Sequence, residues 1–236
     1  MTTFSKPLVK AKLVKRYKRF LADVILQDGS VVTSHCPNTG SMRTCGKPDD
    51  IVYLLHSDDP KRKLAYTWEL TETSNGYIGI NTHRPNRIVE EAVLEQRIPE
   101  LTGYESLKRE VKYGENSKID IYLIGAGRRN CYVEIKNVTL LEGDTLFFPD
   151  AVSVRALKHV KELEAMVAAG HRAVLFFLVN RPDGKYFNVA SHIDTKYAEA
   201  LIEAEKKGVE ILCYRVDATL ERLILGDPVP TNIILQ

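Results

Sequence analysis

Short stretches of alternating apolar and polar residues fill the first third of the chain. This alternation and the turn residues between the stretches predict strands at residues 9–14, 20–26, 31–35, 51–55, 67–71 and 77–80. Short strands at this spacing are typical of a small closed barrel. An OB-like barrel and an SH3-like barrel both fit the pattern, and the OB-like barrel also suits nucleic-acid binding.

The pattern changes after Asn81, where helical and strand periods alternate. We predict a helix capped by Asn86 that ends before Pro99, a three-strand meander from Arg109 to Val138, and then a helix, strand, helix and strand at 152–169, 173–179, 194–207 and 209–216. The chain is therefore expected to be an α/β (α+β) protein, with a barrel over residues 1–82 and a second domain over residues 83–236.

The meander carries the most informative polar residues. Asp120 lies on its second strand, and Glu134 and Lys136 lie on its third strand, two residues apart and thus on one face. A hairpin centred on Gly127 pairs Asp120 with Glu134, which puts their Cβ atoms about 4.5–5.5 Å apart. Two carboxylates and one ammonium are therefore expected to converge.

Glu110 would add a third carboxylate, because a hairpin centred near Glu115 places it opposite Asp120. Neighbouring like charges are destabilising unless a hard cation takes their oxygens as ligands, which favours Mg²⁺ or Mn²⁺. The same residues are also consistent with a solvated outer face of the sheet, which is the usual place for charged side chains.

Composition limits the class of protein. The chain has 236 residues, 44% of them hydrophobic and 27% charged, as expected of a globular protein with a sizeable core. Its four cysteines form no C-x-x-C pair, so neither a disulfide framework nor a zinc site is indicated, and a reducing cytoplasm is expected. The longest apolar run, 173–179, is too short to span a membrane, and we expect neither export nor insertion.

Basic charge is concentrated near the N-terminus, where residues 6–19 contain seven Lys or Arg and no acid. Cations interleaved with Tyr17 and Phe20 resemble a strand that follows a nucleic-acid backbone, although lysines on an edge strand also prevent aggregation. A second basic loop follows Pro60, and the loop 36–42 is rich in turn residues. The candidate phosphate contacts in this half are Lys15, Arg16, Lys18, Arg19, Lys61 and Arg62.

The order of elements, with an acid on the second meander strand and Glu-x-Lys on the third, resembles the core of the PD-(D/E)xK nuclease superfamily. At the level of the whole chain the sequence resembles the sugar fermentation stimulation protein A family. The resemblance rests on RYKRFLADV from Arg16, HCPNTG from His35, KRK from Lys61, TWEL from Thr67, EVKYG from Glu110, FPDAV from Phe148 and KH from Lys158. It implies DNA binding, an OB-like N-terminal domain, a nuclease-like C-terminal α/β domain and a link to sugar utilisation.

The superfamily resemblance also implies roles for single residues. Its metal-binding acids fall on Asp120 and Glu134, its catalytic lysine on Lys136, and its optional acid on the first helix on Glu91. Ile119 stands where the superfamily usually has proline.

The helix after the meander carries further candidates. Arg155, Lys158 and His159 would bind phosphate beside the metal, although Lys158 and His159 could instead belong to a basic helix face partnered by Glu162.

Three functional hypotheses follow. The first is a DNA-binding protein with a Mg²⁺- or Mn²⁺-dependent site that cleaves phosphodiesters, and the second is a DNA-binding regulator of sugar (maltose-type) metabolism genes that does not cut. The third is a sugar hydrolase with paired carboxylates, which the neighbouring lysine disfavours. The type of DNA strand and the oligomeric state are left open.

Overall fold

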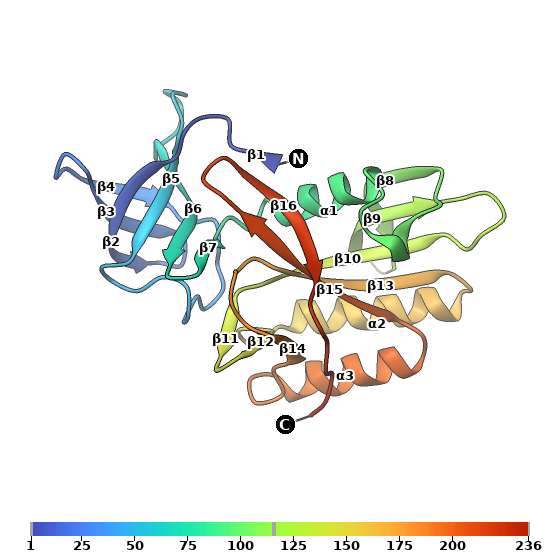
Figure 1. The fold of residues 1–236 in the computed structure, drawn as a ribbon. Coiled ribbons are helices and arrows are strands. Elements are labelled where there is room, and N and C mark those ends of the chain that lie inside the picture. Colours follow the sequence, from blue (N-terminus) through green and yellow to red (C-terminus); the bar gives the residue numbers. More distant parts are fainter. Residues whose placement is uncertain (1, 115–116, 236) are drawn as a thin grey trace.

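The computed structural model describes residues 2–114 and 117–235 of the chain (Figure 1). A barrel of antiparallel strands lies at one end of the molecule, and a large sheet covered by helices forms the rest. The turn expected around Glu115 falls on residues 115–116, outside the described residues.

The N-terminal strands form a barrel. Their order is β4-β3-β2-β5-β6-β7, and a parallel contact between His35 of β4 and Thr67 of β6 closes the barrel. Trp68 is fully buried in its core and donates its indole N–H to the carbonyl of Leu70. All the strands predicted for this half are present: β2(Val9–Tyr17), β3(Leu21–Leu26), β4(Val31–His35), β5(Ile51–His56), β6(Tyr66–Thr73) and β7(Gly76–Gly79).

The second domain is built on a sheet of order β1-β16-β15-β13-β10-β9-β8, in which β10, β13 and β15 run parallel. The predicted barrel segment began at residue 1, but Thr2 and Thr3 pair with β16 and so join this sheet. Its strands are β1(Thr2–Thr3), β8(Ser106–Tyr113), β9(Ser117–Ile124), β10(Cys131–Val138), β13(Arg172–Val179), β15(Glu210–Ala218) and β16(Arg222–Pro228).

Helices cover both faces of this sheet. α1(Pro85–Leu94) packs on one face, while α2(Val154–Ala168) and α3(Thr195–Lys206) pack on the other (Figure 1). After Arg172 the central strand β13 is apolar because it is buried on both faces, with Phe176 toward α1 and Phe177 toward the other helices.

The helix starts follow from local capping. Ser153 accepts a hydrogen bond from the backbone N–H of Ala156 and begins α2, and Asp194 caps α3 in the same way. The prediction that Asn86 caps α1 is wrong, because the N-cap residue is Arg84 and a proline occupies the first helical position.

Several short elements of the second domain were not predicted from the sequence. A three-stranded sheet of β11(Leu140–Glu142), β12(Thr145–Phe148) and β14(Tyr186–Val189) lies beside the barrel, and η1(Pro99–Leu101) follows α1. Just after β12, the Asp150 carboxylate accepts hydrogen bonds from the backbone N–H (2.7 Å) and hydroxyl (3.1 Å) of Ser41. The loop 36–42 therefore joins the barrel to the second domain.

The cysteines and the helices can be compared with the expectations from composition. The cysteines are buried and free. Within the described ranges, no helix is both long and apolar enough to cross a membrane.

Candidate active site

The register predicted for the β9–β10 hairpin is confirmed where the two strands pair. Tyr132 lies opposite Tyr122, and Val133 lies opposite Ile121. The ladder then ends, and the strands separate at Asp120 and Glu134. The Asp120 side chain takes the place of the missing strand partner, because its Oδ2 accepts the backbone N–H of Ile135 at 2.7 Å.

Asp120 is held by two N–H donors in a largely buried position. Besides the backbone N–H of Ile135, the side-chain amide of Asn86 donates a 2.7 Å hydrogen bond to Oδ1. Burial, followed by the nearby negative charge of Glu134, raises the pKa of Asp120 to about 6. Two carboxylates that affect each other's ionisation thus share this part of the sheet.

Glu134 is 3% exposed, and its two carboxylate oxygens differ in their hydrogen-bond partners. Its Oε1 accepts a 2.7 Å hydrogen bond from Nζ of Lys136 and also contacts Nδ1 of His159, while Oε2 is buried without a hydrogen-bond partner. Burial alone would raise the pKa of Glu134, but His159 and Lys136 favour the ionised form and lower it overall. The free oxygen is a ligand atom with no protein donor to satisfy it.

A cavity of about 420 Å³ opens over these carboxylates. Its lining combines acidic and basic side chains from β8, β9, β10 and α2: Glu110, Lys118, Asp120, Glu134, Arg155, Lys158 and His159. The structure thus brings together candidate residues that lie almost fifty positions apart in the chain.

The expected row of three carboxylates is not assembled as a ligand set. Glu110 lines the cavity, but its backbone has a φ of 53° and its side chain is exposed. Among the described residues, no three acidic, histidine or cysteine side chains are arranged to hold an ion. One buried and one half-buried carboxylate, the buried one with an unpartnered oxygen, fit a hard cation such as Mg²⁺, which typically binds one or two carboxylates and retains several waters.

Glu91, the expected acid of the first helix, does not reach the cavity. Its carboxylate accepts hydrogen bonds from the hydroxyl of Thr2 (2.9 Å) and from Nε of Arg87 (3.0 Å). The α1 residue that reaches Asp120 is Asn86, which the sequence suggested only as a cap. Its one sequence signal is a polar side chain beside the apolar stripe of the helix.

The α2 candidates differ in their surroundings. Arg155 and Lys158 are exposed on the helix, and Nζ of Lys158 lies 3.5 Å from Oε1 of Glu162, the pairing weighed as the alternative. His159 is 5% exposed and contacts Glu134, so it belongs to the buried part of the site and not to a basic outer face.

The barrel candidates divide into exposed and engaged side chains. Arg16 donates through Nη2 to the carbonyls of Arg19, Asn38 and Gly40, so its guanidinium holds the loop 36–42 instead of facing solvent.

The other barrel cations are closer to the surface. Nζ of Lys15 lies 3.6 Å from Oδ2 of Asp23. Nη2 of Arg62 donates a 2.9 Å hydrogen bond to the hydroxyl of Thr67. The remaining candidates are exposed: Lys18 and Arg19, next to the 48% exposed Phe20 in the β2–β3 turn, and Lys61 in the second basic loop.

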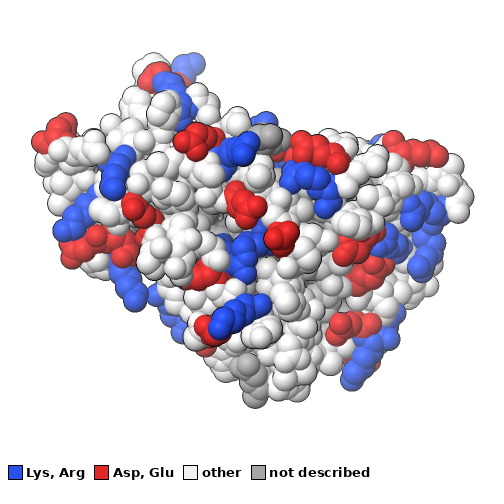
Figure 2. Space-filling model, viewed as in Figure 1, with Lys and Arg blue, Asp and Glu red and all other residues white. Residues whose placement is uncertain are grey.

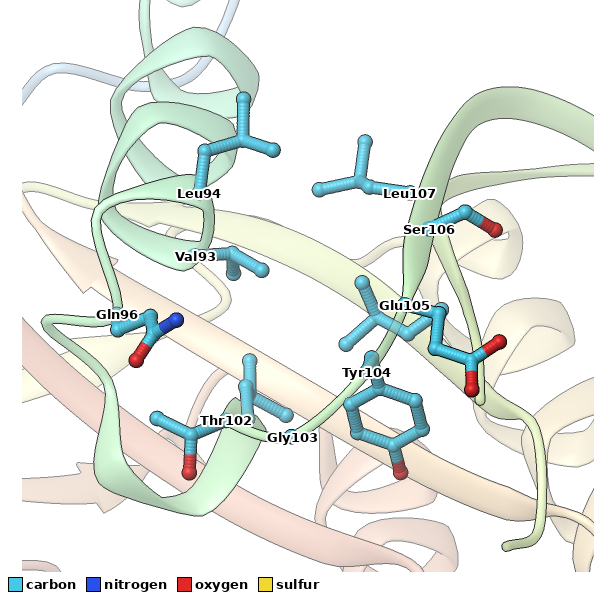
Figure 3. Close-up of a pocket in the computed structure, with 11 residues that line it drawn as sticks. Val93, Leu94, Gln96, Thr102, Gly103, Tyr104, Glu105, Ser106 and Leu107 are labelled. Carbon is cyan, nitrogen blue, oxygen red and sulfur yellow. The ribbon is translucent and has the colours of Figure 1, made fainter. Parts of the chain in front are cut away.

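Other parts of the described surface differ from this cavity in the side chains they present. On the face shown in Figure 2, Lys and Arg alternate with Asp and Glu, and no broad basic area is visible. A pocket between α1 and β8 is lined by apolar side chains such as Leu94 and Leu107, with Glu105 as its one carboxylate (Figure 3). The Asp120–Glu134 cavity is therefore the candidate active site.

A closed barrel followed by a sheet-and-helix domain with an adjacent Asp, Glu and Lys set defines an OB-like barrel joined to a nuclease-like α/β domain. Comparison with protein-family models agrees with this class. Residues 14–80 match the model described as the SfsA N-terminal OB domain, and residues 83–222 match the sugar fermentation stimulation protein RE domain. The chain therefore belongs to the sugar fermentation stimulation protein (SfsA) family, and its barrel is of the OB type, not SH3-like.

Solved structures place the chain with the same family. It matches Pyrococcus furiosus SfsA, determined in complex with Ca²⁺, with a TM-score of 0.88 and 27% identity over 99% of this chain and 98% of the other. The small subunit of a heterodimeric restriction endonuclease matches with a TM-score of 0.30 and 15% identity over 55% of this chain and 62% of that one. This second likeness is too low to carry an argument.

Proposed function

We propose that this protein binds DNA and cleaves phosphodiester bonds at the Asp120–Glu134 cavity with the help of a divalent cation. The observation that carries the proposal is the pair of carboxylates, Glu134 buried and Asp120 half-buried, at the point where β9 and β10 separate, with one carboxylate oxygen of Glu134 left without a donor. A buried acceptor of this kind is costly unless a cation or water occupies it. The Ca²⁺ complex of the Pyrococcus relative supports a divalent ion in this family.

Asp120, Glu134 and the backbone carbonyl of Ile135 would hold the ion, with water and phosphate as its further ligands. When bound, Mg²⁺ or Mn²⁺ neutralises phosphate charge and lowers the pKa of a water molecule. The two N–H donors on Asp120 fix the direction of its carboxylate before any ligand arrives.

Lys136 would act on the substrate from its position beside Glu134 and His159, which line the cavity. An ammonium has three donors, and the contacts of Lys136 with Glu134 (2.7 Å) and His159 (3.1 Å) use at most two of them. The remaining donor can orient a water or stabilise charge on a phosphate oxygen. Its side chain is only 11% exposed, so this interaction would occur in partly desolvated surroundings.

The barrel would supply nucleic-acid affinity away from the cavity. Phe20, Lys18 and Arg19 are exposed together in the β2–β3 turn, which gives one ring for stacking and two cations for phosphate. Arg155 would add a phosphate contact at the cavity itself. Because Arg16 is occupied by backbone carbonyls, we assign it to folding and not to this surface.

Nicking of supercoiled plasmid DNA in the presence of Mg²⁺ or Mn²⁺ tests the proposal. We expect cleavage by the wild type, and its loss in Asp120→Asn and in Lys136→Gln while DNA binding is retained. Asp227→Asn and Lys196→Gln change exposed residues of the same types and should cleave like the wild type. Cleavage that survives both site substitutions would contradict the assignment of the site.

One observation favours a second function, that of a DNA-binding regulator that does not cut. Oε1 of Glu134 already has two partners, Lys136 and His159, which could stand in for a metal ion. A regulator would bind DNA with the same affinity in Mg²⁺, Mn²⁺ or a chelator, and would nick DNA under none of these conditions. A link to sugar metabolism genes would then be tested by selecting bound sequences from genomic DNA.

A further inference from the structure

Two lysines face each other across the hairpin that borders the active-site cavity. Lys112 of β8 pairs directly with Lys118 of β9 in the antiparallel ladder. The Cβ atoms of such cross-strand partners lie about 4.5–5.5 Å apart, and like charges in this position are destabilising. Both side chains are exposed.

Folding of the hairpin does not explain this pair. In the part of the chain that the structure describes, neither Lys112 nor Lys118 forms an ion pair with a carboxylate. Lysines on an edge strand can prevent strand addition, and β8 is the edge of the large sheet. That role accounts for Lys112 but not for Lys118, because β9 is paired on both sides.

The position of the pair connects it to the acidic cavity. Lys118 and Ser117 line both the active-site cavity and a second hollow of about 340 Å³, which Lys112 also lines. The two hollows therefore adjoin along β9. A chain of phosphates that had one member over Asp120 and Glu134 would have its next member within reach of the lysine pair.

We propose that Lys112 and Lys118 together bind one backbone phosphate of the nucleic acid, next to the phosphodiester that lies over Asp120 and Glu134. A single phosphate can accept hydrogen bonds from two ammonium groups on adjacent strands, and it removes the repulsion between them. The bound strand would run from the β8–β9 hairpin across the cavity to Arg155 at the start of α2. This inference rests on the DNA binding proposed above.

The test measures the affinity of a fluorescent DNA duplex, and of the same single strand, over a series of salt concentrations. We expect Lys112→Gln with Lys118→Gln to weaken binding about tenfold or more. Because the two lysines share one phosphate, the log–log salt slope on duplex should fall by about 0.9 in total in the double variant. The matched control is Lys196→Gln, an exposed lysine on α3, which should leave affinity and slope unchanged.

A charge reversal separates phosphate binding from a structural role. Lys112→Glu places an acid opposite Lys118 but outside the acidic cavity, so it should raise the melting temperature while it weakens DNA binding, and a merely structural role would not give these opposite signs. If the double variant kept the wild-type affinity and salt slope, the two lysines would not bind a phosphate, and the proposal of DNA binding itself would stand. Absence of DNA binding by the wild-type protein would instead overturn the proposed function, and the lysine pair with it.

Discussion

The side-chain amide of Asn86 donates a 2.7 Å hydrogen bond to Oδ1 of Asp120, so the first turn of α1 supports a carboxylate on β9. This bond favours the ionised form of Asp120 and opposes the effect of burial on its pKa. The contact reaches the site from the sheet face opposite to α2. The site is therefore supported from both faces of the sheet.

Replacing Asn86 should make Mn²⁺ binding more dependent on pH. In Asn86→Ala the pKa of Asp120 rises above its value of about 6, because one stabilising hydrogen bond is lost. Below that pKa, each unit of rise should weaken Mn²⁺ binding about tenfold, since a proton competes for the ligand. Calorimetric titration with Mn²⁺ between about pH 5 and pH 8 measures the shift. Asn75→Ala, in an exposed turn, is the control, and an unchanged pH profile in Asn86→Ala would refute the argument.

The metal-free protein should lose stability at Asp120 as the pH rises. Its pKa in the folded state is about 6, above the ordinary 3.8, so the stability it contributes is fully present below about pH 4 and is lost as the pH rises through 6. Asp120→Asn has no such group. The free energy of unfolding of this variant, relative to wild type, should therefore rise between about pH 4 and pH 7, by up to about 3 kcal/mol.

Urea unfolding in the presence of a chelator measures this difference. Asp227→Asn should show a difference that does not vary with pH, because Asp227 is exposed. If the stability of Asp120→Asn relative to wild type stayed constant or fell over the same range, burial would not be raising this pKa.

His159 should be important for folding as well as for the site. It is 5% exposed and contacts Oε1 of Glu134, so His159→Ala leaves a buried carboxylate with Lys136 as its one close cation among the described residues. We expect a loss of about 2–3 kcal/mol in the free energy of unfolding at neutral pH, the range for a hydrogen bond to a charged group. Urea unfolding gives the value, and the exposed His83→Ala should change it little. Equal stability of the two variants would show that the contact contributes nothing.

The pair between Arg84 and Glu69 should contribute to stability much more than a surface pair. Two hydrogen bonds of 2.8 Å and 3.1 Å join them, and Glu69 is 2% exposed. Arg84→Met should cost about 3–5 kcal/mol, because a buried charge loses its partner. The control is Arg87→Met, which breaks the exposed pair with Glu91 and should cost less than about 1 kcal/mol. Similar losses in both variants, measured by thermal unfolding, would contradict this ranking.

Local patterns were enough to predict the barrel strands and the register of the β9–β10 hairpin, which ends beside the site. The strands of the barrel are short, alternate regularly and are separated by turn residues, so each could be located without knowledge of its partners. The β9–β10 register follows from the hairpin around Gly127, because a short turn leaves little freedom in pairing. For that reason Asp120 and Glu134 could be predicted to lie close together.

Long-range relationships could not be predicted in the same way. The strands β11, β12 and β14 are only three or four residues long, and β14 pairs with β12 from a distant part of the chain. Helix periodicity predicts which face of a helix is apolar. It does not predict which end of the helix approaches the sheet. Glu91 was chosen because the superfamily resemblance implies an acid on this helix, whereas the residue that reaches Asp120 is Asn86. Arg16 looked like a surface cation because its carbonyl partners lie in a loop more than twenty residues away.

The pairing of β1 with β16 has a consequence for the order of folding. Thr2 lies opposite Leu223, so the outermost strand of the large sheet joins two segments at opposite ends of the sequence, with the whole barrel between them. During synthesis the barrel can close on its own contacts, whereas β1 must wait for a partner that leaves the ribosome more than two hundred residues later. The final step of assembly would then be the docking of this early segment, which locks an already folded barrel onto the completed sheet.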